Sequence, residues 1–198
     1  MIIPYIAVFF GIIVLQNAWG ALIGFHMSLL PAVLPNWRGI AWSFRSPVAK
    51  SVLWPVSLSG LFAGVGLWLL WTITGIPADF QMKVASMGLR GVIWPVFILY
   101  FILVNPWLEE VYWRHFLNSP SRFPAIVDFL FAGYHLIILS KFVGPALMLT
   151  AFVILTCAAW FWRRISSYTQ SLMPAALAHL MADISILFAV YRFAVFPM

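Results

Sequence analysis

The sequence predicts an all-α integral membrane protein, a polytopic bundle of about six transmembrane helices. Hydrophobic residues make up 64% of the chain and charged residues 8%, and the mean hydropathy is +1.02. A water-soluble domain carries about 25% charged residues, so this composition excludes a soluble globular protein. The apolar runs are too long and continuous for barrel strands, and helices then satisfy the backbone inside the bilayer.

Six apolar segments are predicted to form the membrane helices, and each needs about 20 residues to cross the bilayer. We expect them to make one integral membrane domain, residues 1–198, with no repeat and no soluble appendage. In chain order the segments cover about 3–30, 51–76, 91–117, 124–140, 144–162 and 172–191.

The first two segments differ in polarity. Gln16, Asn17 and His26 make the first segment the most polar of the six, and we expect hydrogen bonds between helices there. No basic residue precedes its apolar run and no obvious small-residue cleavage site follows, so the sequence predicts a retained helix and not a signal peptide. The second segment is almost entirely apolar.

The other four segments have recognisable ends. The third follows Arg90 and stops at the turn-forming stretch NSPSRFP, and the fourth is the shortest. The fifth is closed by Arg163 and Arg164. It contains Cys157, which cannot form an internal disulfide because the chain has one cysteine.

The net charge of +6 is explained by membrane topology, and we expect no binding of nucleic acid. Basic residues concentrate on cytoplasmic loops, and the loops after the first, third and fifth segments carry more of them. Six lie on that side (Arg38, Arg45, Lys50, Arg122, Arg163 and Arg164) and four on the other (Lys83, Arg90, Lys141 and Arg192). We therefore expect these three loops in the cytoplasm, with both termini outside.

The third segment contains an unusual stretch, NPWLEEVYWRHFL, with two adjacent acidic residues among apolar ones. A charged side chain at the centre of a membrane helix costs about 2.5–3.5 kcal/mol and usually faces the bundle interior. Glu110 and Arg114 are one helical turn apart, so they share a face and can pair. That pairing leaves Glu109 available for another role.

Later segments repeat the four-residue spacing. Phe131 and His135 lie one turn apart in the fourth segment, as do His179 and Asp183 in the sixth. Any one of these polar residues alone is most simply an interhelical hydrogen-bonding group.

Depth in the membrane favours a common site. Glu109 lies about 12 Å before the end of the third segment, His135 about 16 Å into the fourth, and His179 about 11 Å into the sixth. These distances are counted from one side of the bilayer. A carboxylate and two imidazoles therefore reach similar depths, which indicates a site opening toward the cytoplasmic side.

The three clusters, EEVYWR, FAGYH and HLMAD, resemble the EExxxR, FxxxH and Hxxx[N/D] motifs of a known family. This is the CAAX-protease and bacteriocin-processing family, also called the Abi family of intramembrane endopeptidases. The motifs occur in the family's order and lie on three predicted helices, within a family-like catalytic core of about 91–192. His115 is one departure, since the family often has glycine after the arginine.

The resemblance implies an intramembrane endopeptidase that cleaves membrane-associated peptide or protein substrates. Glu109 would be the general base that takes a proton from the attacking water, and His135 would position that water. His179 and Asp183 would stabilise the oxyanion. An ionised Asp183 repels an oxyanion, so it must be protonated or instead orient His179.

The resemblance also implies a supporting role for Glu110 and Arg114, which would hold the local geometry. We expect no cofactor; the alternative is a zinc-dependent version of the peptidase, because two histidines and a carboxylate are a known zinc set. The H-E-x-x-H signature is absent from the chain.

A second class of function is open to the same fold. The protein could be a non-catalytic scaffold, an immunity factor or an accessory subunit of a membrane protein complex that retains the protease fold. The expected partners are the lipid bilayer and a membrane-associated substrate or protein.

Overall fold

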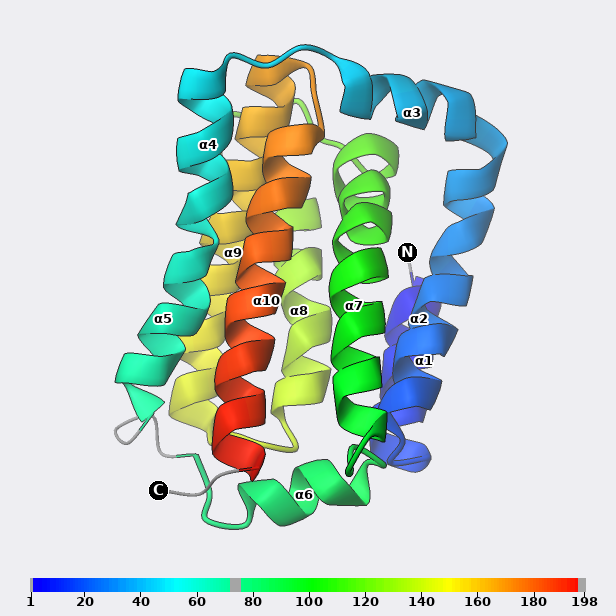
Figure 1. Ribbon diagram of the computed structural model, residues 1–198. Helices are drawn as coiled ribbons and strands as arrows, with labels where there is room; N and C mark the ends of the chain where they lie inside the picture. The colour runs from blue at the N-terminus through cyan, green and yellow to red at the C-terminus, as the bar shows by residue number, and fades with distance from the viewer. Residues whose placement is uncertain (1, 72–75, 196–198) are drawn as a thin grey trace.

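The computed structural model describes residues 2–71 and 76–195, and every regular element within them is a helix. Long helices run alongside one another, with α3 across one end of the bundle and α6 across the other (Figure 1). The predicted all-α fold is confirmed. The elements are α1 (Ile2–Phe9), the π-helix η1 (Phe10–Val14), α2 (Ala18–Val33), the 3-10 helix η2 (Leu34–Asn36), α3 (Trp37–Arg45), α4 (Lys50–Ser59), α5 (Leu61–Leu69), α6 (Phe80–Ser86), α7 (Ile93–Glu110), the π-helix η4 (Val111–Phe116), α8 (Ile126–Leu139), α9 (Pro145–Thr169) and α10 (Met173–Val195).

Four helical stretches of the described chain are long and apolar enough to cross a membrane. A fifth is found if α2 and α3, which form a bent pair, are counted as one span. The expected number of about six is therefore approximate, because two other apolar helices are shorter than a span: Ile2–Val14 and Ile126–Leu139. The four long stretches are Lys50–Leu69, Ile93–Phe116, Pro145–Thr169 and Met173–Val195.

The predicted single helix over 3–30 is wrong, because the chain reverses direction between η1 and α2 (Figure 1). Gln16 has a positive φ of 49°, and Asn17 caps α2 by accepting a hydrogen bond from the Gly20 N–H at 2.8 Å. Asparagine is a preferred N-cap residue. Asn17 therefore starts a helix, whereas the prediction gave it a role between helices.

The helices α4 and α5 pack closely against α10. A Cβ atom on Gly60 would lie 1.9 Å from the carbonyl oxygen of Ala178, and one on Gly64 would lie 2.1 Å from the carbonyl carbon of Ser185. The Gly64 N–H also donates to the Ser185 Oγ at 3.1 Å. Small residues allow such close backbone approach between membrane helices.

The loop between η4 and α8 is held by one buried arginine. The Arg163 guanidinium donates to both carboxylate oxygens of Asp128, with its shortest contact at 2.7 Å. It also donates to the backbone carbonyls of Ser119, Ser121 and Phe123. Arg163, one of the basic residues assigned above to a loop, is thus buried and paired at the end where α8 begins.

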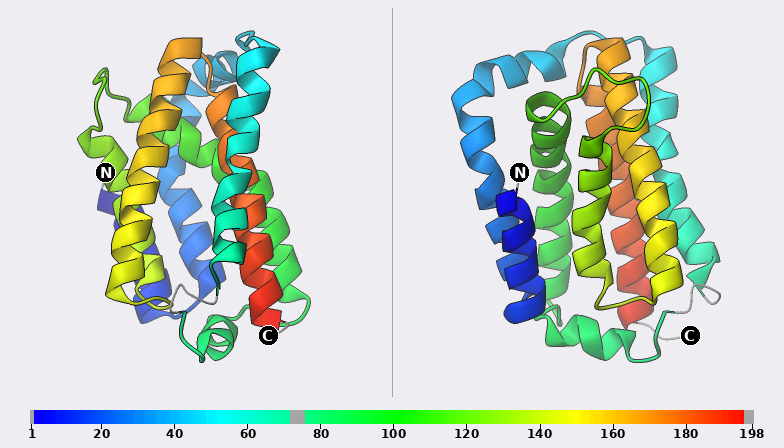
Figure 2. Two further views of the ribbon diagram at one scale, coloured as in Figure 1. Left: turned by 90° about the vertical axis from the view of Figure 1, so that its left-hand side faces the viewer. Right: turned by 180° about the vertical axis from the view of Figure 1, so that it is seen from behind.

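The connections before α4, before α8 and before α10 lie at the same end of the bundle as α3 (Figures 1 and 2). These are the three connections that the basic residues predicted to lie on the same side of the membrane. The C-terminal end of α10 lies at the opposite end, near α6. The end of η4 and the starts of α8 and α10 therefore meet at one end, which brings the three motifs to one region of the bundle.

Candidate active site

The first motif spans the junction between α7 and η4. Glu109 and Glu110 are 1% and 0% exposed, and Glu110 Oε2 lies 3.2 Å from Arg114 Nε. The predicted pairing of Glu110 with Arg114 is therefore present. The Arg114 guanidinium also lies over the Phe131 ring, 4.4 Å from its centroid, so the first motif contacts the second.

The third motif contacts the first through the same glutamate. His179 Nδ1 lies 3.0 Å from Glu110 Oε1, and His179 Nε2 lies 3.6 Å from Asp183 Oδ1. The imidazole stacks on Trp162 with ring centroids 4.9 Å apart. Because each ring nitrogen faces a carboxylate, an imidazole protonated on both nitrogens fits this position.

A polar chain continues from Asp183 to α2. The Asn105 amide nitrogen donates to Asp183 Oδ2 at 3.4 Å, and His26 Nε2 donates to Asn105 Oδ1 at 3.1 Å. His26 Nδ1 then accepts from the Tyr100 hydroxyl at 3.1 Å. His26 thus makes the hydrogen bonds between helices that were expected of it, and it supports Asp183 through Asn105.

Glu109 takes part in a separate set of contacts with α8. The Tyr134 hydroxyl lies 2.6 Å from Glu109 Oε1 and 3.0 Å from His135 Nε2. His135 Nδ1 donates to the carbonyl of Phe131 at 2.8 Å. Among the described residues, Glu109 Oε2 has no hydrogen-bond partner. One oxygen of the predicted base is therefore held, and the other faces no protein donor in the described chain.

Most of the site is closed off from the surface. His135 and Asp183 are partly exposed, the Asp183 side chain to 13%. The remaining site groups are buried: Glu109, Glu110, Arg114, Tyr134 and His179. The site therefore reaches the protein surface at His135 and Asp183.

The structure brings together all six residues that the motifs predicted, although their chemical roles stay predictions. Two further residues, Tyr134 and Asn105, were missed. Tyr134 directly precedes His135, and Asn105 lies four residues before Glu109, on the same helix face. The signal that could have found them was a polar residue beside a motif histidine for Tyr134, and a polar residue one turn from the motif glutamate for Asn105.

His115, the departure from the family pattern, points away from the site. It is exposed, and its Nδ1 lies 3.5 Å from the Ser43 hydroxyl. Together with Trp37 and Arg38 it lines a surface cavity of about 470 Å³ beside α3. The contacts that join the three motifs, as described above, therefore do not include His115.

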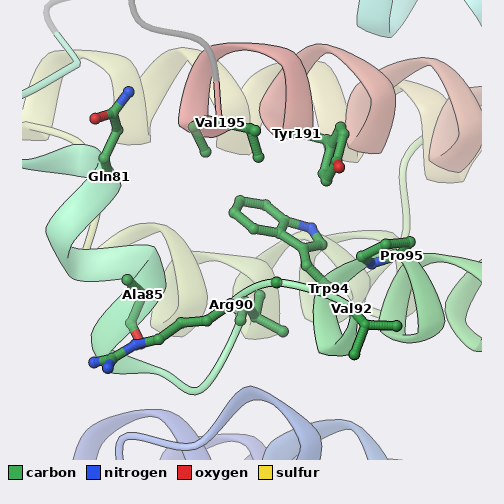
Figure 3. A pocket seen from close by; sticks show the side chains of 11 residues that line it. Gln81, Ala85, Arg90, Val92, Trp94, Pro95, Tyr191 and Val195 are labelled. Atoms are coloured by element: carbon green, nitrogen blue, oxygen red, sulfur yellow. The ribbon is translucent and has the colours of Figure 1, made fainter.

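A second cavity of about 480 Å³ lies at the opposite end of the molecule, between α6, α7 and α10 (Figure 3). Its walls include Gln81, Trp94 and Tyr191, while the Arg90 side chain turns toward Ala85, whose carbonyl accepts from Arg90 Nε at 2.7 Å. None of the motif residues lines this cavity.

Zinc, the alternative to the metal-free mechanism, would need an unprotonated ring nitrogen from each histidine. In the described part of the chain, no group of three His, Cys, Asp or Glu residues is placed to hold a metal ion. The ring nitrogens left for a metal are Nε2 of His135, whose Nδ1 donates to a carbonyl, and Nε2 of His179, whose Nδ1 lies against Glu110. The metal-free and the zinc-dependent mechanisms therefore stay alternatives for experiment.

The fold and the site together define a polytopic helical membrane protein with a buried site of carboxylates and imidazoles. Residues 90–185 match the family model described as type II CAAX prenyl endopeptidase Rce1-like. This match covers just under half of the chain and supports the CAAX-protease and bacteriocin-processing family, a family of proteases, as the three motifs predicted. Comparison with curated proteins and with solved structures found no match.

Proposed function

We propose that the protein is an intramembrane endopeptidase in which Glu109 activates the attacking water. The observation that supports this best is the Glu109 carboxylate: Tyr134 holds Oε1, while Oε2 is buried without a partner among the described residues. An unsatisfied buried acceptor is costly, about 1–3 kcal/mol or more. A water bound there would satisfy the oxygen and be placed for proton transfer.

The proposed reaction uses the site groups in order. The water oxygen bonds to the peptide carbonyl carbon while its proton passes to Glu109, and negative charge develops on the carbonyl oxygen. His179 Nε2–H stabilises that charge, because its contact with Asp183 at 3.6 Å is longer than a hydrogen bond. The C–N bond then breaks and the amine takes a proton.

Asp183 is proposed to orient His179 and not to bind the oxyanion. Its Oδ2 accepts from the Asn105 amide nitrogen, and its Oδ1 lies 3.6 Å from His179 Nε2, beyond hydrogen-bond distance. In this proposal an ionised aspartate stabilises the charged imidazole electrostatically and leaves its Nε2–H to the oxyanion. Glu110 holds the other nitrogen of the same imidazole.

The substrate class follows from the position of the site. Glu109 lies seven residues before the end of η4 at Phe116, about 11 Å along the helix axis. A bond cleaved there must enter the bilayer, so we propose a membrane-associated peptide or protein as the substrate. The family's name makes prenylated CAAX proteins the first substrates to offer.

We propose that the end carrying α3 faces the cytoplasm. Arg38 and Arg45 of α3 are exposed, as are Trp37 and Trp42, whereas Ile40 is buried. A short helix with this division lies in a membrane interface, and its arginines favour the anionic cytoplasmic leaflet.

The test compares wild type with Glu109→Gln, which keeps the shape and removes the base. Both purified proteins are reconstituted in liposomes with a panel of prenylated and unprenylated membrane peptides, and products are identified by mass spectrometry. We expect cleavage by wild type and a loss of at least about 10²-fold in kcat for the variant. A matched control is His115→Gln, an exposed histidine outside the site, with unchanged kcat.

The same experiment separates the alternatives. If all three proteins are equally inert while wild type co-purifies stoichiometrically with a membrane protein complex, the non-catalytic scaffold is favoured. A zinc-dependent peptidase would lose activity with a chelator and recover it with zinc, whereas the proposed mechanism predicts full activity in the chelator.

A further inference from the structure

We propose that Tyr134 is a positioning residue that relays a proton between Glu109 and His135. The transfer makes Glu109 an ionised base in the same step in which it makes His135 a protonated acid. This inference rests on the proposed peptidase function and adds to it a source for the proton that the leaving amine requires. Tyr134 belongs to none of the fixed positions of the three motifs.

The geometry leaves the Tyr134 hydroxyl between two acceptors. It lies 2.6 Å from Glu109 Oε1 and 3.0 Å from His135 Nε2. His135 Nδ1 must carry a hydrogen, because its partner at 2.8 Å is the carbonyl oxygen of Phe131. In the neutral imidazole, Nε2 is therefore the unprotonated nitrogen.

Counting protons shows what this arrangement requires. A hydroxyl has one hydrogen and can donate to one acceptor at a time. If both contacts are hydrogen bonds, one extra proton must reside on Glu109 or on His135 Nε2. The proton is on Glu109 when Tyr134 donates to His135, and on His135 when Tyr134 donates to Glu109.

Hydrolysis can begin only from the second state, in which Tyr134 donates to Glu109 and the extra proton is on His135. Glu109 is then an ionised base and His135 a protonated acid, and a shift of two protons through the Tyr134 oxygen converts the first state into the second. During the reaction Glu109 gains a proton from water, and His135 gives its Nε2 proton to the amine as the C–N bond breaks. Rotation of the Glu109 carboxyl group then presents the new proton, received at Oε2, to the Tyr134 oxygen. This restores the first state, and a two-proton shift through Tyr134 resets the pair with no net change in protons.

The surroundings hold Tyr134 in place for this role. The side chain is 3% exposed, and its ring stacks on Phe25 at 5.0 Å and lies parallel to Trp113 at 5.9 Å, within 4°. The other charged groups of the site form their own chain, in which the carboxylates of Glu110 and Asp183 flank His179, and Glu110 also pairs with an arginine. The extra proton is thus confined to Glu109 and His135.

The first test observes the proton directly and needs no substrate. The chain has four histidines, so the full-length protein labelled with ¹⁵N-histidine in lipid nanodiscs gives few ring resonances, and His135→Gln assigns those of His135. We expect Nε2 of His135 in wild type to be hydrogen-bonded and partly protonated. In Tyr134→Phe it should move to the position of a free, unprotonated nitrogen, and in Glu109→Gln it should lose its protonated fraction.

The control is Tyr5→Phe, which removes a hydroxyl from the same wall of the site. Tyr5 donates to the carbonyl of Leu130 on α8, and its ring contacts that of Tyr134 edge-on. We expect its His135 resonances to match wild type. Equal His135 resonances in wild type and Tyr134→Phe would overturn the relay, as would the same shift in Tyr5→Phe.

The second test is kinetic. Tyr134→Phe should lower kcat about 10²-fold and leave KM within about threefold, because the lost step follows substrate binding. Wild-type kcat in this variant would also overturn the relay. If wild type cleaves no peptide, the peptidase proposal fails by itself and the ¹⁵N spectrum alone decides whether Glu109 and His135 share a proton.

Discussion

The two adjacent glutamates of the site have different partners, and this difference supports the different roles proposed for them. Glu110 Oε1 lies 3.0 Å from His179 Nδ1, and its Oε2 forms an ion pair with Arg114 Nε at 3.2 Å without hydrogen-bond geometry. Glu109 Oε1 accepts from Tyr134, and its Oε2 has neither a hydrogen bond nor an ion pair in the described residues. A carboxylate paired on both oxygens supports the structure, whereas one with an open oxygen can take a proton.

Residue spacing was enough to predict the Glu110–Arg114 pair, because both lie on one helix face. It could not predict that Glu110 also holds His179, since that contact joins α7 to α10 and depends on packing. Asn105 and Tyr134 were missed for the same reason: their partners lie on other helices.

Replacement of Asp183 tests whether it orients His179. In Asp183→Asn the amide oxygen can still face His179 Nε2, so we expect kcat within about tenfold of wild type. Asp183→Leu removes both oxygens, so we expect a loss of about 10²–10³-fold. Peptide cleavage in liposomes measures both. Equal losses in the two variants would show that the negative charge itself is required.

Single helices show where sequence patterns suffice and where they fail. The runs of α9 and α10 were predicted well, although α9 continues to Thr169, beyond the basic pair at Arg163 and Arg164 that was expected to close it. Arg163 does not end the helix because Asp128 and three carbonyls bind it inside the protein. The break before α2 was missed because long apolar runs flank Asn17 on both sides. These runs favoured one continuous helix, although asparagine is also a preferred N-cap residue.

The close contact of α5 with α10 gives a prediction with a matched control on the same helix. Gly64→Ala places a Cβ against the Ser185 backbone, and we expect it to destabilise the protein by about 1–3 kcal/mol. A Cβ on Gly66 meets nothing within 4 Å, so Gly66→Ala should be neutral or slightly stabilising. Unfolding in detergent, followed by circular dichroism, measures both. Equal stability of the two variants would contradict the packing described here.

For the whole molecule, composition predicted the membrane and the all-α class, and the order of three motifs predicted the family. The number of spans was predicted only approximately, because a helix of 14 residues such as α8 has the same apolar character as a longer one. Its length is fixed by the loop that Arg163 holds, and that contact joins segments far apart in the chain.

Membrane orientation can be measured with two single cysteines. In a Cys157→Ser background, Phe123→Cys reports on the end with α3, where Phe123 is 78% exposed. Gly144→Cys, at the N-cap of α9, reports on the opposite end, where α9 begins. A membrane-impermeant maleimide added to intact cells should label Gly144→Cys and leave Phe123→Cys unlabelled until the cells are opened. The reverse result would place the site's end outside the cell.

The two apolar helices too short for a span, Ile2–Val14 and α8, lie next to each other, and Tyr5 of the first bonds to the Leu130 carbonyl of the second. At 1.5 Å per residue, a helix of 14 residues extends about 21 Å, against a hydrocarbon thickness of about 30 Å. A bilayer meets such a mismatch by local thinning. For the proposed peptidase, thinning along this edge would shorten the path by which a polar peptide backbone descends from the interface.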